Sequence, residues 1–490
     1  MDSIPEDSKC IVETKDGPVC GLIDKNDEGT YYKFRSIPYA KPPLGRLRFL
    51  PPSQIEPWKP VLDATKEAPL PLCLIPNKSI NGSEDCLYIE VSTPSTQPAK
   101  AMPVMFWIGT YAYTGILDNV FDPSLINDQE VVFVRCGFRI GPFGFLSIND
   151  FTAPGNCGLK DVVMALKWVQ KNISAFGGDP DNVTIFGGSS GGAIVHLMML
   201  SPMATGLFHK AIIQSASALN NWAIAKNPSQ AVMDLANELK ITKTSSVEVV
   251  EELRSLPAED IMNAFFNMNF EASLMTNQDV IDAIFKPCIE VDFEGQPAFI
   301  TKSPLLIMKS GNFNKVPLII GSNNIEAALF EFIKEDFYSD YEKFNENASL
   351  LVPRSLARED KLTKVIGHQL LKFYLGGEEH LREDTRTQYL QLINICKGSR
   401  DSMTTRRRVV KMWTNFAKTS NPTPDESDGL LKITWDPVEN QDKLNYLSIG
   451  SELTKGRNPF EERMKFWDSL HQEHAFLRTL VYFNDIGVSW

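Results

Sequence analysis

A serine set among glycines is the strongest chemical signal in the chain. Residues 187–191 read Gly-Gly-Ser-Ser-Gly, with β-forming residues before them and a helix-compatible run at 193–200 after them. A sharp strand-to-helix turn lifts a serine hydroxyl clear of a sheet, and only small residues fit around its strained backbone. The following helix would direct free N–H groups at a reacting oxygen. The pattern predicts a nucleophile elbow with Ser189 at its tip, and the alternative is a Gly/Ser-rich turn that only joins a strand to a helix.

Strands and helices alternate on both sides of this turn. Strands are expected at 11–14, 19–23, 31–37, 86–91, 103–108, 131–134, 211–215 and 317–321. Helices are expected at 159–176, within 229–265, and at 357–374, 406–418 and 463–470. Continuous apolar runs such as 103–108 suit strands that are buried on both faces of a parallel sheet. The alternation predicts an α/β fold, and with no repeat or clear boundary we expect one domain over residues 1–490.

Composition narrows the class of protein. The 490 residues are 43% hydrophobic and 22% charged, which is ordinary for a globular chain, and the formal net charge is −12. No basic face is evident, so nucleic-acid binding is not expected. Residues 1–9 are polar and lack the apolar segment of a signal peptide, and no run approaches the about 18 apolar residues of a membrane span. A cytoplasmic location without a transmembrane segment is the expectation.

The eight cysteines are scattered and contain no Cys-x-x-Cys pair. A zinc site is therefore not expected, and we expect neither a metal nor a cofactor. Reduced thiols are the default in the cytosol. Cys73 and Cys86 could close a short loop in an oxidising compartment, so their redox state stays open.

Several long motifs resemble the type B carboxylesterases, the α/β-hydrolases that include the cholinesterases, and look closest to the intracellular insect α-esterases. The motifs lie at 37–49, 83–88, 139–147, 155–161, 176–180, 411–417, 421–424 and 435–437, in addition to the elbow. The resemblance implies an α/β-hydrolase fold, in which helices flank a central, mostly parallel sheet and a small antiparallel sheet lies near the N-terminus. It also implies a small-molecule carboxylic ester as substrate and an acyl-enzyme formed on Ser189.

Family order places the acid after the nucleophile and before the histidine. Residues 322–327, Ser-Asn-Asn-Ile-Glu-Ala, follow the expected strand at 317–321 and match the family's acid motif. The resemblance therefore implies that Glu326 is the acid of the triad. The glycine that usually follows the acid is replaced by Ala327.

The oxyanion segment departs from the family pattern. Where the family has His-Gly-Gly-Gly-Phe, residues 109–113 read Gly-Thr-Tyr-Ala-Tyr. The resemblance implies that the backbone N–H groups of Ser190, Tyr111 and Ala112 would form the oxyanion hole. Thr110 is β-branched and Tyr111 is bulky, and both are poor residues for positive φ. We therefore expect a degenerate oxyanion hole.

No catalytic histidine is identified. Of the six histidines, His196 and His209 precede the acid, and we expect both to be structural. The later four lack the family's sequence context; they are His368, His380, His471 and His474. The family has about one further strand and a histidine loop where this chain runs directly through 394–399. The motif spacing therefore predicts that an internal block is deleted near 394–399.

Three interpretations follow. The chain is a serine carboxylesterase, impaired because the histidine and the glycine-rich oxyanion segment are absent. Alternatively, it is a non-catalytic relative that binds or sequesters apolar ligands or protein partners. A third interpretation is a product shortened by splicing or by an error in the gene model. Retention of Ser189 and Glu326 argues against degeneration, whereas the two defects argue for impaired chemistry.

Overall fold

The protein is described here by a computed structural model. It describes residues 8–26, 29–74, 80–116, 123–220, 222–268, 285–323, 340–352, 360–378, 380–382, 402–425, 428–440, 443–449 and 452–473. The chain divides into two compact units. The first unit comprises 1–320 and 409–424, and the second comprises 321–408 and 425–490. The expectation of a single domain over 1–490 stays a prediction.

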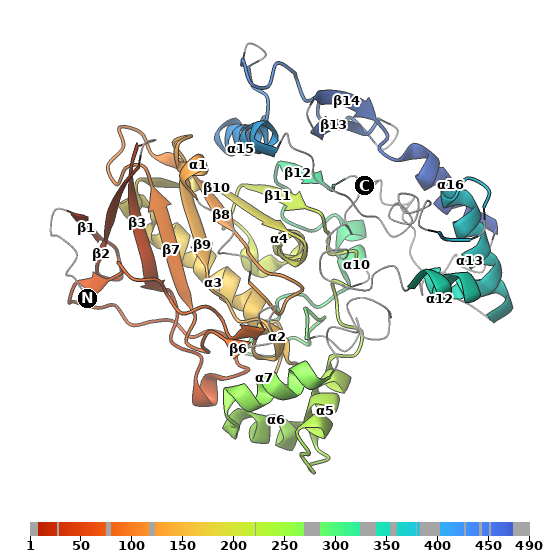
Figure 1. Ribbon diagram of the computed structural model, residues 1–490. Coiled ribbons are helices and arrows are strands. Elements are labelled where there is room, and N and C mark those ends of the chain that lie inside the picture. Colours follow the sequence, from red (N-terminus) through yellow and green to blue (C-terminus); the bar gives the residue numbers. More distant parts are fainter. Residues whose placement is uncertain are drawn as a thin grey trace. The chain divides into compact units, whose positions relative to one another are not determined.

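A ten-stranded sheet forms the centre of the first unit (Figure 1). Its strand order among the described residues is β1-β2-β3-β7-β9-β8-β10-β11-β12, and β4 pairs with β2. The strands are β1 (Lys9–Glu13), β2 (Pro18–Asn26), β3 (Gly29–Pro38), β4 (Leu62–Asp63), β7 (Tyr88–Thr93), β8 (Met102–Trp107), β9 (Val132–Cys136), β10 (Gly178–Gly188), β11 (Lys210–Gln214) and β12 (Leu318–Gly321). A separate small antiparallel pair is formed by β5 (Cys73–Leu74) and β6 (Ile80–Asn81).

The direction of pairing changes across the sheet. β1, β2, β3, β7 and β9 pair antiparallel in succession, whereas β9, β8, β10 and β11 pair parallel. The parallel strands are the apolar runs of the sequence, and the residues of β9 and β11 are almost all buried. Such continuous burial is expected where helices cover both faces of a parallel sheet. The predicted central, mostly parallel sheet of an α/β fold is thus confirmed. Most of the antiparallel strands near the N-terminus, which were expected to form a small sheet of their own, are continuous with it.

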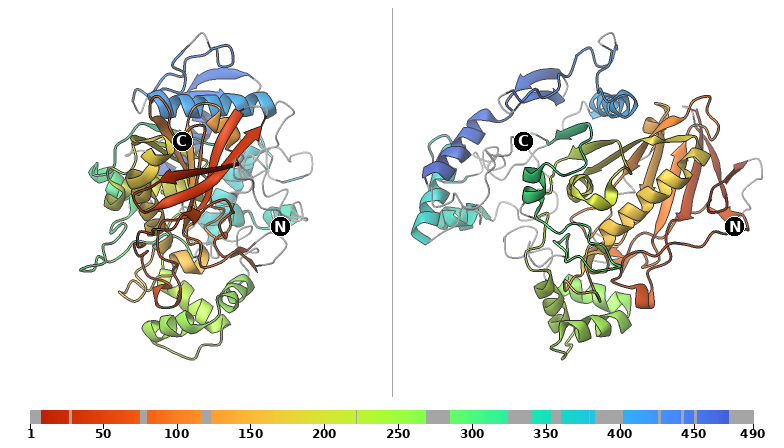
Figure 2. Two further views of the ribbon diagram at one scale, coloured as in Figure 1. Left: turned by 90° about the vertical axis from the view of Figure 1, so that its left-hand side faces the viewer. Right: turned by 180° about the vertical axis from the view of Figure 1, so that it is seen from behind.

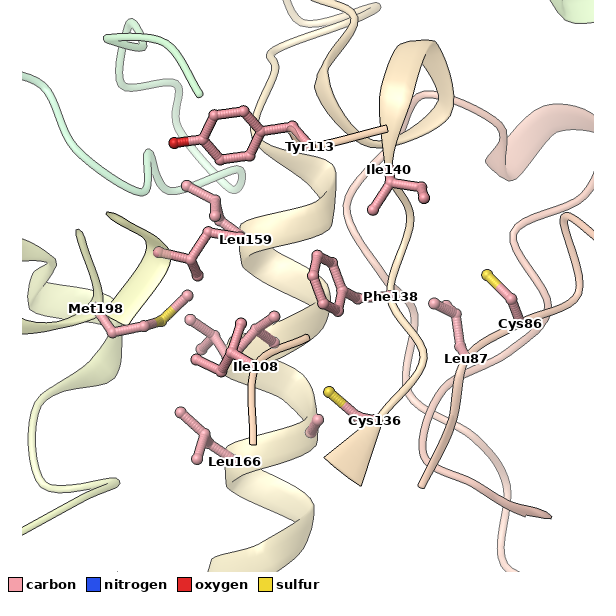
Figure 3. Close-up of a cluster of buried hydrophobic side chains, with 14 of the residues drawn as sticks. Cys86, Leu87, Ile108, Tyr113, Cys136, Phe138, Ile140, Leu159, Leu166 and Met198 are labelled. Carbon is pink, nitrogen blue, oxygen red and sulfur yellow. The ribbon is translucent and has the colours of Figure 1, made fainter. Parts of the chain in front are cut away.

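Two long helices pack against the strands that carry the candidate site (Figure 2). α3 (Cys157–Asn172) and α4 (Ser190–Leu200) contact each other, and both contact β10. Nearly every residue of α4 is buried, so this helix lies inside the molecule rather than on its surface. Figure 3 shows Leu159 and Leu166 of α3 close to Ile108 and to Met198 of α4. This core fixes the end of β8 and the start of α4 relative to each other.

The remaining helices of the first unit lie around this core. They are α1 (Ser124–Asn127), α2 (Gly141–Phe145), α5 (Pro228–Glu238), α6 (Ser246–Ser255), α7 (Ala258–Asn267) and α10 (Pro304–Ser310), with short 3-10 turns at Gly45–Leu47, Ile173–Phe176 and Pro202–Ala204. α5, α6 and α7 pack together, and α7 contacts β5 and β6. The helical content expected within 229–265 is therefore present as three helices.

The second unit is smaller and mainly helical. It contains α12 (Asp340–Glu346), a 3-10 turn at Ala348–Leu351, α13 (Asp360–Tyr374), the hairpin β13 (Asn445–Ile449) and β14 (Leu453–Arg457), and α16 (Glu461–Glu473). α15 (Ser402–Thr419) begins in this unit and enters the first unit at Val409. The second unit has a small hydrophobic cluster. Val352, Ile366 and Leu370 are buried in it, and Phe466 and Trp467 pack on them.

Other features bear on the class of protein. Seven of the cysteines are free thiols in the described part of the chain, Cys73 and Cys86 among them. Burial raises the pKa of the Cys86 thiol well above its usual range. Within the described ranges, no helix combines the length and hydrophobicity needed to cross a membrane. In the same part of the chain, no group of three His, Cys, Asp or Glu side chains is arranged to hold a metal ion.

Candidate active site

Ser189 lies at the strand-to-helix turn between β10 and α4. Its backbone has φ 53° and ψ −126°, a conformation that non-glycine residues rarely adopt. Its N–H donates to the carbonyl of Gln214 at 2.9 Å, and its carbonyl accepts from Ala193 N–H at 3.0 Å. Ser189 is exposed, whereas its neighbour Ser190 is fully buried. The turn therefore presents the hydroxyl of Ser189 to solvent on a strained backbone held from both sides.

Three glycines make this turn sterically possible. A Cβ at Gly187 would lie 2.7 Å from the backbone of Gly191, and a Cβ at Gly191 would lie 2.2 Å from the carbonyl oxygen of Ile108. A Cβ at Gly192 would lie 2.8 Å from the carbonyl oxygen of Gln214. These contacts are with backbone atoms, which cannot move aside as a flexible side chain could. β8, β10 and β11 thus approach the start of α4 too closely for any side chain.

Gly188 has more room than these three glycines. A Cβ there would meet its nearest atom, Oε1 of Gln214, at 3.5 Å, which is ordinary van der Waals contact. The backbone thus has room for a side chain at this position, and the turn does not require glycine at 188.

The segment after β8 closes into a tight loop. Tyr111 N–H donates to the carbonyl of Gly115 at 2.8 Å, and Gly115 N–H donates back to the carbonyl of Tyr111 at 2.9 Å. The hydroxyl of Thr110 donates to the same Gly115 carbonyl at 3.1 Å. We call residues 110–115 the oxyanion loop. These three hydrogen bonds all join residues of the loop itself.

Positive φ occurs in this loop, but not where the sequence suggested. Ala112 has φ 51° and Tyr113 has φ 63°. Thr110 and Tyr111, the two residues judged poor for positive φ, are not among the residues with positive φ. A left-handed conformation costs a non-glycine residue roughly 1–2 kcal/mol. Two consecutive residues of this kind therefore need compensating contacts.

The three backbone N–H groups expected to form the oxyanion hole differ in their hydrogen bonding. Because Tyr111 N–H is bonded to Gly115, Tyr111 has no free N–H to offer an oxyanion. The N–H of Ala112 has no hydrogen-bond partner among the described residues. The N–H of Ser190 belongs to the first residue of α4, where no carbonyl of the helix's own earlier turn is available. The geometry favours the N–H groups of Ser190 and Ala112 as oxyanion donors. It does not favour Tyr111, whose N–H is already bonded within the loop.

Tyr113 holds the end of the loop in the core. Its hydroxyl donates to the carbonyl of Ala223 at 3.3 Å, and its carbonyl accepts from Gly141 N–H at 2.7 Å. Its ring makes an edge contact with Phe145, with the ring centroids 5.5 Å apart. Burial raises the pKa of Tyr113 far above its usual range, so the phenol stays neutral. Figure 3 shows Tyr113 at one end of the buried cluster.

Two histidines lie in the described part of the first unit, and each accepts a hydrogen bond from a backbone N–H group. Nδ1 of His196 accepts from Ala218 N–H at 3.1 Å, and Nδ1 of His209 accepts from Val183 N–H at 3.1 Å. Burial lowers the pKa of His196 to about 4 and also lowers that of His209. Both rings thus act as hydrogen-bond acceptors for the framework, as a structural role requires.

The other predicted site residues fall elsewhere. Glu326 and His474 lie outside the described residues, as does the 394–399 segment. His368 in α13 and His380 are exposed residues of the second unit, and His471 is in α16. The structure therefore places Ser189 next to Ser190, links Ser190 to the oxyanion loop by two hydrogen bonds, and leaves the acid as a prediction.

Sequence reasoning missed the hydroxyl of Ser190 and an ion pair. The buried hydroxyl of Ser190 donates to the carbonyl of Thr110 at 3.0 Å and accepts from Tyr113 N–H at 3.3 Å. The only signal for this was a serine where alanine is common. Asp161 forms a buried ion pair with Arg139, in which a carboxylate oxygen lies 2.7 Å from a guanidinium nitrogen.

Comparison with known proteins identifies the family of the chain. A sequence model of the carboxylesterase family matches residues 8–399 and 397–467. The chain belongs to the carboxylesterase family. The match consists of two segments that meet at 397–399, close to the junction where the motif spacing indicated a deleted block.

Individual relatives are esterases. Juvenile hormone esterase of Tribolium castaneum is 36% identical over 389 residues, which cover 75% of this chain and 64% of that protein. The chain thus spans less than two thirds of that relative. Para-nitrobenzyl esterase of Bacillus subtilis is 30% identical over 510 residues, covering 94% of this chain and 99% of that protein.

A solved structure shares the fold. Juvenile hormone esterase from Manduca sexta, with OTFP covalently attached, superposes with a TM-score of 0.77 and 25% sequence identity. The superposition covers 95% of this chain and 100% of that one. The α/β-hydrolase fold expected from the motifs is thereby confirmed.

Proposed function

We propose that this carboxylesterase-family chain reacts with carboxylic esters through Ser189, and that its turnover is impaired. In the proposed reaction, Oγ of Ser189 attacks the ester carbonyl carbon and its proton passes to the leaving alcohol as the C–O bond breaks. Water then attacks the acyl carbon, releasing the acid and restoring the serine hydroxyl. A base must hold the proton in both steps.

The conformation of Ser189 is the single observation that carries the proposal. A strained, exposed serine at the N-terminus of a buried helix is costly to build and has no structural use that alanine or glycine would not serve better. The free N–H groups of Ser190 and Ala112 lie in the two segments that flank it. These features support an acyl-transfer site that keeps its nucleophile and part of its oxyanion hole.

The expected impairment rests on the base. Both histidines in the described part of the first unit use Nδ1 to accept a backbone N–H, and burial disfavours their charged forms. A triad histidine does the opposite, because its Nδ1–H donates to a carboxylate while Nε2 takes the proton. The two-segment family match at 397–399 supports loss of the block that would carry the base.

The alternative is a non-catalytic protein that binds apolar ligands or protein partners. The same observations on His196 and His209 favour it, since a serine without a base stays a neutral alcohol. It differs from the first proposal in one respect, because Ser189 would then be chemically silent towards acylating or phosphorylating reagents.

The decisive experiment is labelling of Ser189 by a fluorophosphonate probe, followed by mass spectrometry. Loss of a triad histidine costs about 10⁶ in turnover in a well-studied protease. We therefore expect labelling over hours rather than seconds, and hydrolysis of p-nitrophenyl butyrate only slightly above buffer. Ser189→Ala should abolish the slow labelling, and Ser201→Ala, a buried serine at the far end of α4, should leave it unchanged.

Each outcome discriminates between the readings. Rapid stoichiometric labelling would show that a base is present and would refute impairment. No labelling of a folded protein after a day would refute acyl transfer on Ser189 and leave the non-catalytic reading.

A further inference from the structure

The hydroxyl of Ser190 joins the elbow to the oxyanion loop. Ser190 is the first residue of α4 and is fully buried. It donates a hydrogen bond to the carbonyl of Thr110 and accepts one from Tyr113 N–H, at 3.0 and 3.3 Å. These two backbone groups lie on either side of Ala112, the residue whose N–H is free.

The two bonds act where the loop is strained. Ala112 and Tyr113 are the residues with positive φ, and the carbonyl and N–H held by Ser190 bracket them. A glycine-rich loop adopts such a conformation without side-chain help, because glycine has no Cβ. This chain has no glycine at 110–114. An alanine at 190 would leave both backbone groups without these bonds in a buried site, which is unfavourable.

We infer that Ser190 is a positioning residue, whose hydroxyl takes over the role of the missing glycines and holds Ala112 N–H beside Ser189. The inference deepens the proposed function and rests on it for its chemical consequence. Its structural half, the anchoring of the oxyanion loop, is independent of any activity. Ser190 acts through Ala112 and does not itself react.

The test uses Ser190→Ala with two readouts. Hydrogen exchange of peptides covering residues 109–116, measured by mass spectrometry, reports the loop directly. We expect exchange about tenfold faster in the variant, because a buried hydrogen-bond acceptor of Tyr113 N–H is removed. The second readout is binding of phenylboronic acid, whose tetrahedral adduct on Ser189 is seen by ¹¹B NMR. Loss of a correctly placed donor should weaken this adduct by about tenfold to a hundredfold.

The chain offers a matched control and a rescue. Ser201 lies just past the other end of α4, is equally buried, and makes the same pair of bonds, donating to the carbonyl of Phe299 and accepting from Met203 N–H. Ser201→Ala should change neither readout. Adding Ala112→Gly to Ser190→Ala should recover part of the boronate affinity, because glycine adopts positive φ without strain.

The outcomes separate the inference from the proposed function. Unchanged exchange at 109–116 in a folded Ser190→Ala protein would overturn the inference. Faster exchange with unchanged boronate affinity would show a purely structural bond and would also overturn it. No adduct on the unmodified protein would refute the proposed chemistry at Ser189, and with it the positioning role, while the exchange result would still show whether the hydroxyl anchors the loop.

Discussion

Ser189 and Ser190 are adjacent, yet their side chains have opposite surroundings. The first is exposed on a strained turn, and the second is buried with both hydrogen-bonding functions used. Burial and bonding make Ser190 a poor nucleophile. On the proposals made above, Ser189 reacts and Ser190 positions the oxyanion loop.

His196 should make the stability of the protein depend on pH. Its pKa is about 4 in the folded chain because of burial, against about 6.5 when exposed. Between these values the unfolded chain binds more protons, so stability falls as the pH falls from 6.5 to 4, by about 3 kcal/mol in total. His196→Asn keeps an acceptor for Ala218 N–H but does not titrate, and it should flatten urea-midpoint curves over this range.

His209→Asn is the matched control for that experiment. This ring also accepts a backbone N–H, but it is only half-buried, and the charge of Asp181 partly opposes the lowering of its pKa. We expect a smaller flattening of the curve. Identical pH curves for the unmodified protein and His196→Asn would contradict the burial of a neutral ring at 196.

The residues of the site were only partly predictable. Ser189 was predicted because its turn is local and leaves a pattern of glycines in the sequence. The sequence did not predict which residues of the oxyanion loop have positive φ. Residue preference marked Thr110 and Tyr111 as poor residues for positive φ, and the structure has positive φ at Ala112 and Tyr113 instead. This part of the loop is bonded to Ser190, about 80 residues away in the sequence, and a local pattern cannot reveal such contacts.

At the scale of elements, the elbow should distinguish sharply between its glycines. Gly191→Ala would bring a Cβ to 2.2 Å from the carbonyl oxygen of Ile108, and β8 or α4 would have to move. We expect a loss of about 3 kcal/mol, measured as a fall in Tm of about 5 °C. Loss of Ser189 labelling should accompany it.

Gly188→Ala is the companion change at the same turn. Its Cβ would meet only ordinary contacts, and Gly188 does not have positive φ. We expect Tm to stay within about 1–2 °C of the unmodified protein. Equal destabilisation by the two changes would show that the close approach of β8 to α4 is not what selects glycine at 191.

A buried ion pair fastens the segment after α7 to α3. Nζ of Lys160 lies 2.6 Å from Oε1 of Glu290, and the other oxygen of Glu290 accepts from Asn156 Nδ2 and Phe299 N–H. Burial raises the pKa of Glu290, and Lys160 opposes that shift. Removing one charge from such a pair leaves the other buried without its counter-charge.

Lys160→Met should therefore cost about 3–5 kcal/mol in urea unfolding. The double change Lys160→Met with Glu290→Gln should cost less than Lys160→Met alone, because no charge is left unpaired and the amide oxygen still accepts the N–H groups. If the double variant is the less stable of the two, the uncompensated charge is not the source of the loss.

The elements themselves were largely predictable, and the exceptions have a common cause. Strands such as β8 and β9 are continuous apolar runs, so composition alone locates them to within one or two residues. The hairpin of β13 and β14 was missed, since Leu447 is the only buried hydrophobic residue in it. Without a buried face, a strand carries no alternation that sequence reasoning can detect.

At the scale of the whole molecule, the match to the carboxylesterase family divides at one junction. The two matching segments meet at 397–399, while the motifs before and after this point are retained. The core of the elbow, formed by β8, β10, α3 and α4, lies entirely in the first unit. Under the proposed loss of a block at this junction, the elbow would therefore remain while the base would be absent.

This separation predicts chemical rescue by free imidazole. If the chain keeps Ser189 and lacks its own imidazole, added imidazole should raise the Ser189-dependent hydrolysis of p-nitrophenyl butyrate. A tethered base acts with an effective concentration of 10⁵ M or more, so about 0.1 M imidazole can restore only a small part of the lost rate. We expect a gain of at most about twofold, because 0.1 M imidazole against an effective concentration of about 10⁵ M restores about one part in 10⁶ of a rate that has fallen by about 10⁶.

Ser189→Ala provides the background in that assay, since imidazole hydrolyses activated esters by itself and that rate rises linearly with concentration. The rescued rate is the difference between the two proteins. A difference that stays at zero across the imidazole range would mean that Ser189 cannot be activated by any base, and the non-catalytic reading would then hold. A positive difference would place at least part of the defect in the missing base, since imidazole does nothing for misplaced N–H donors.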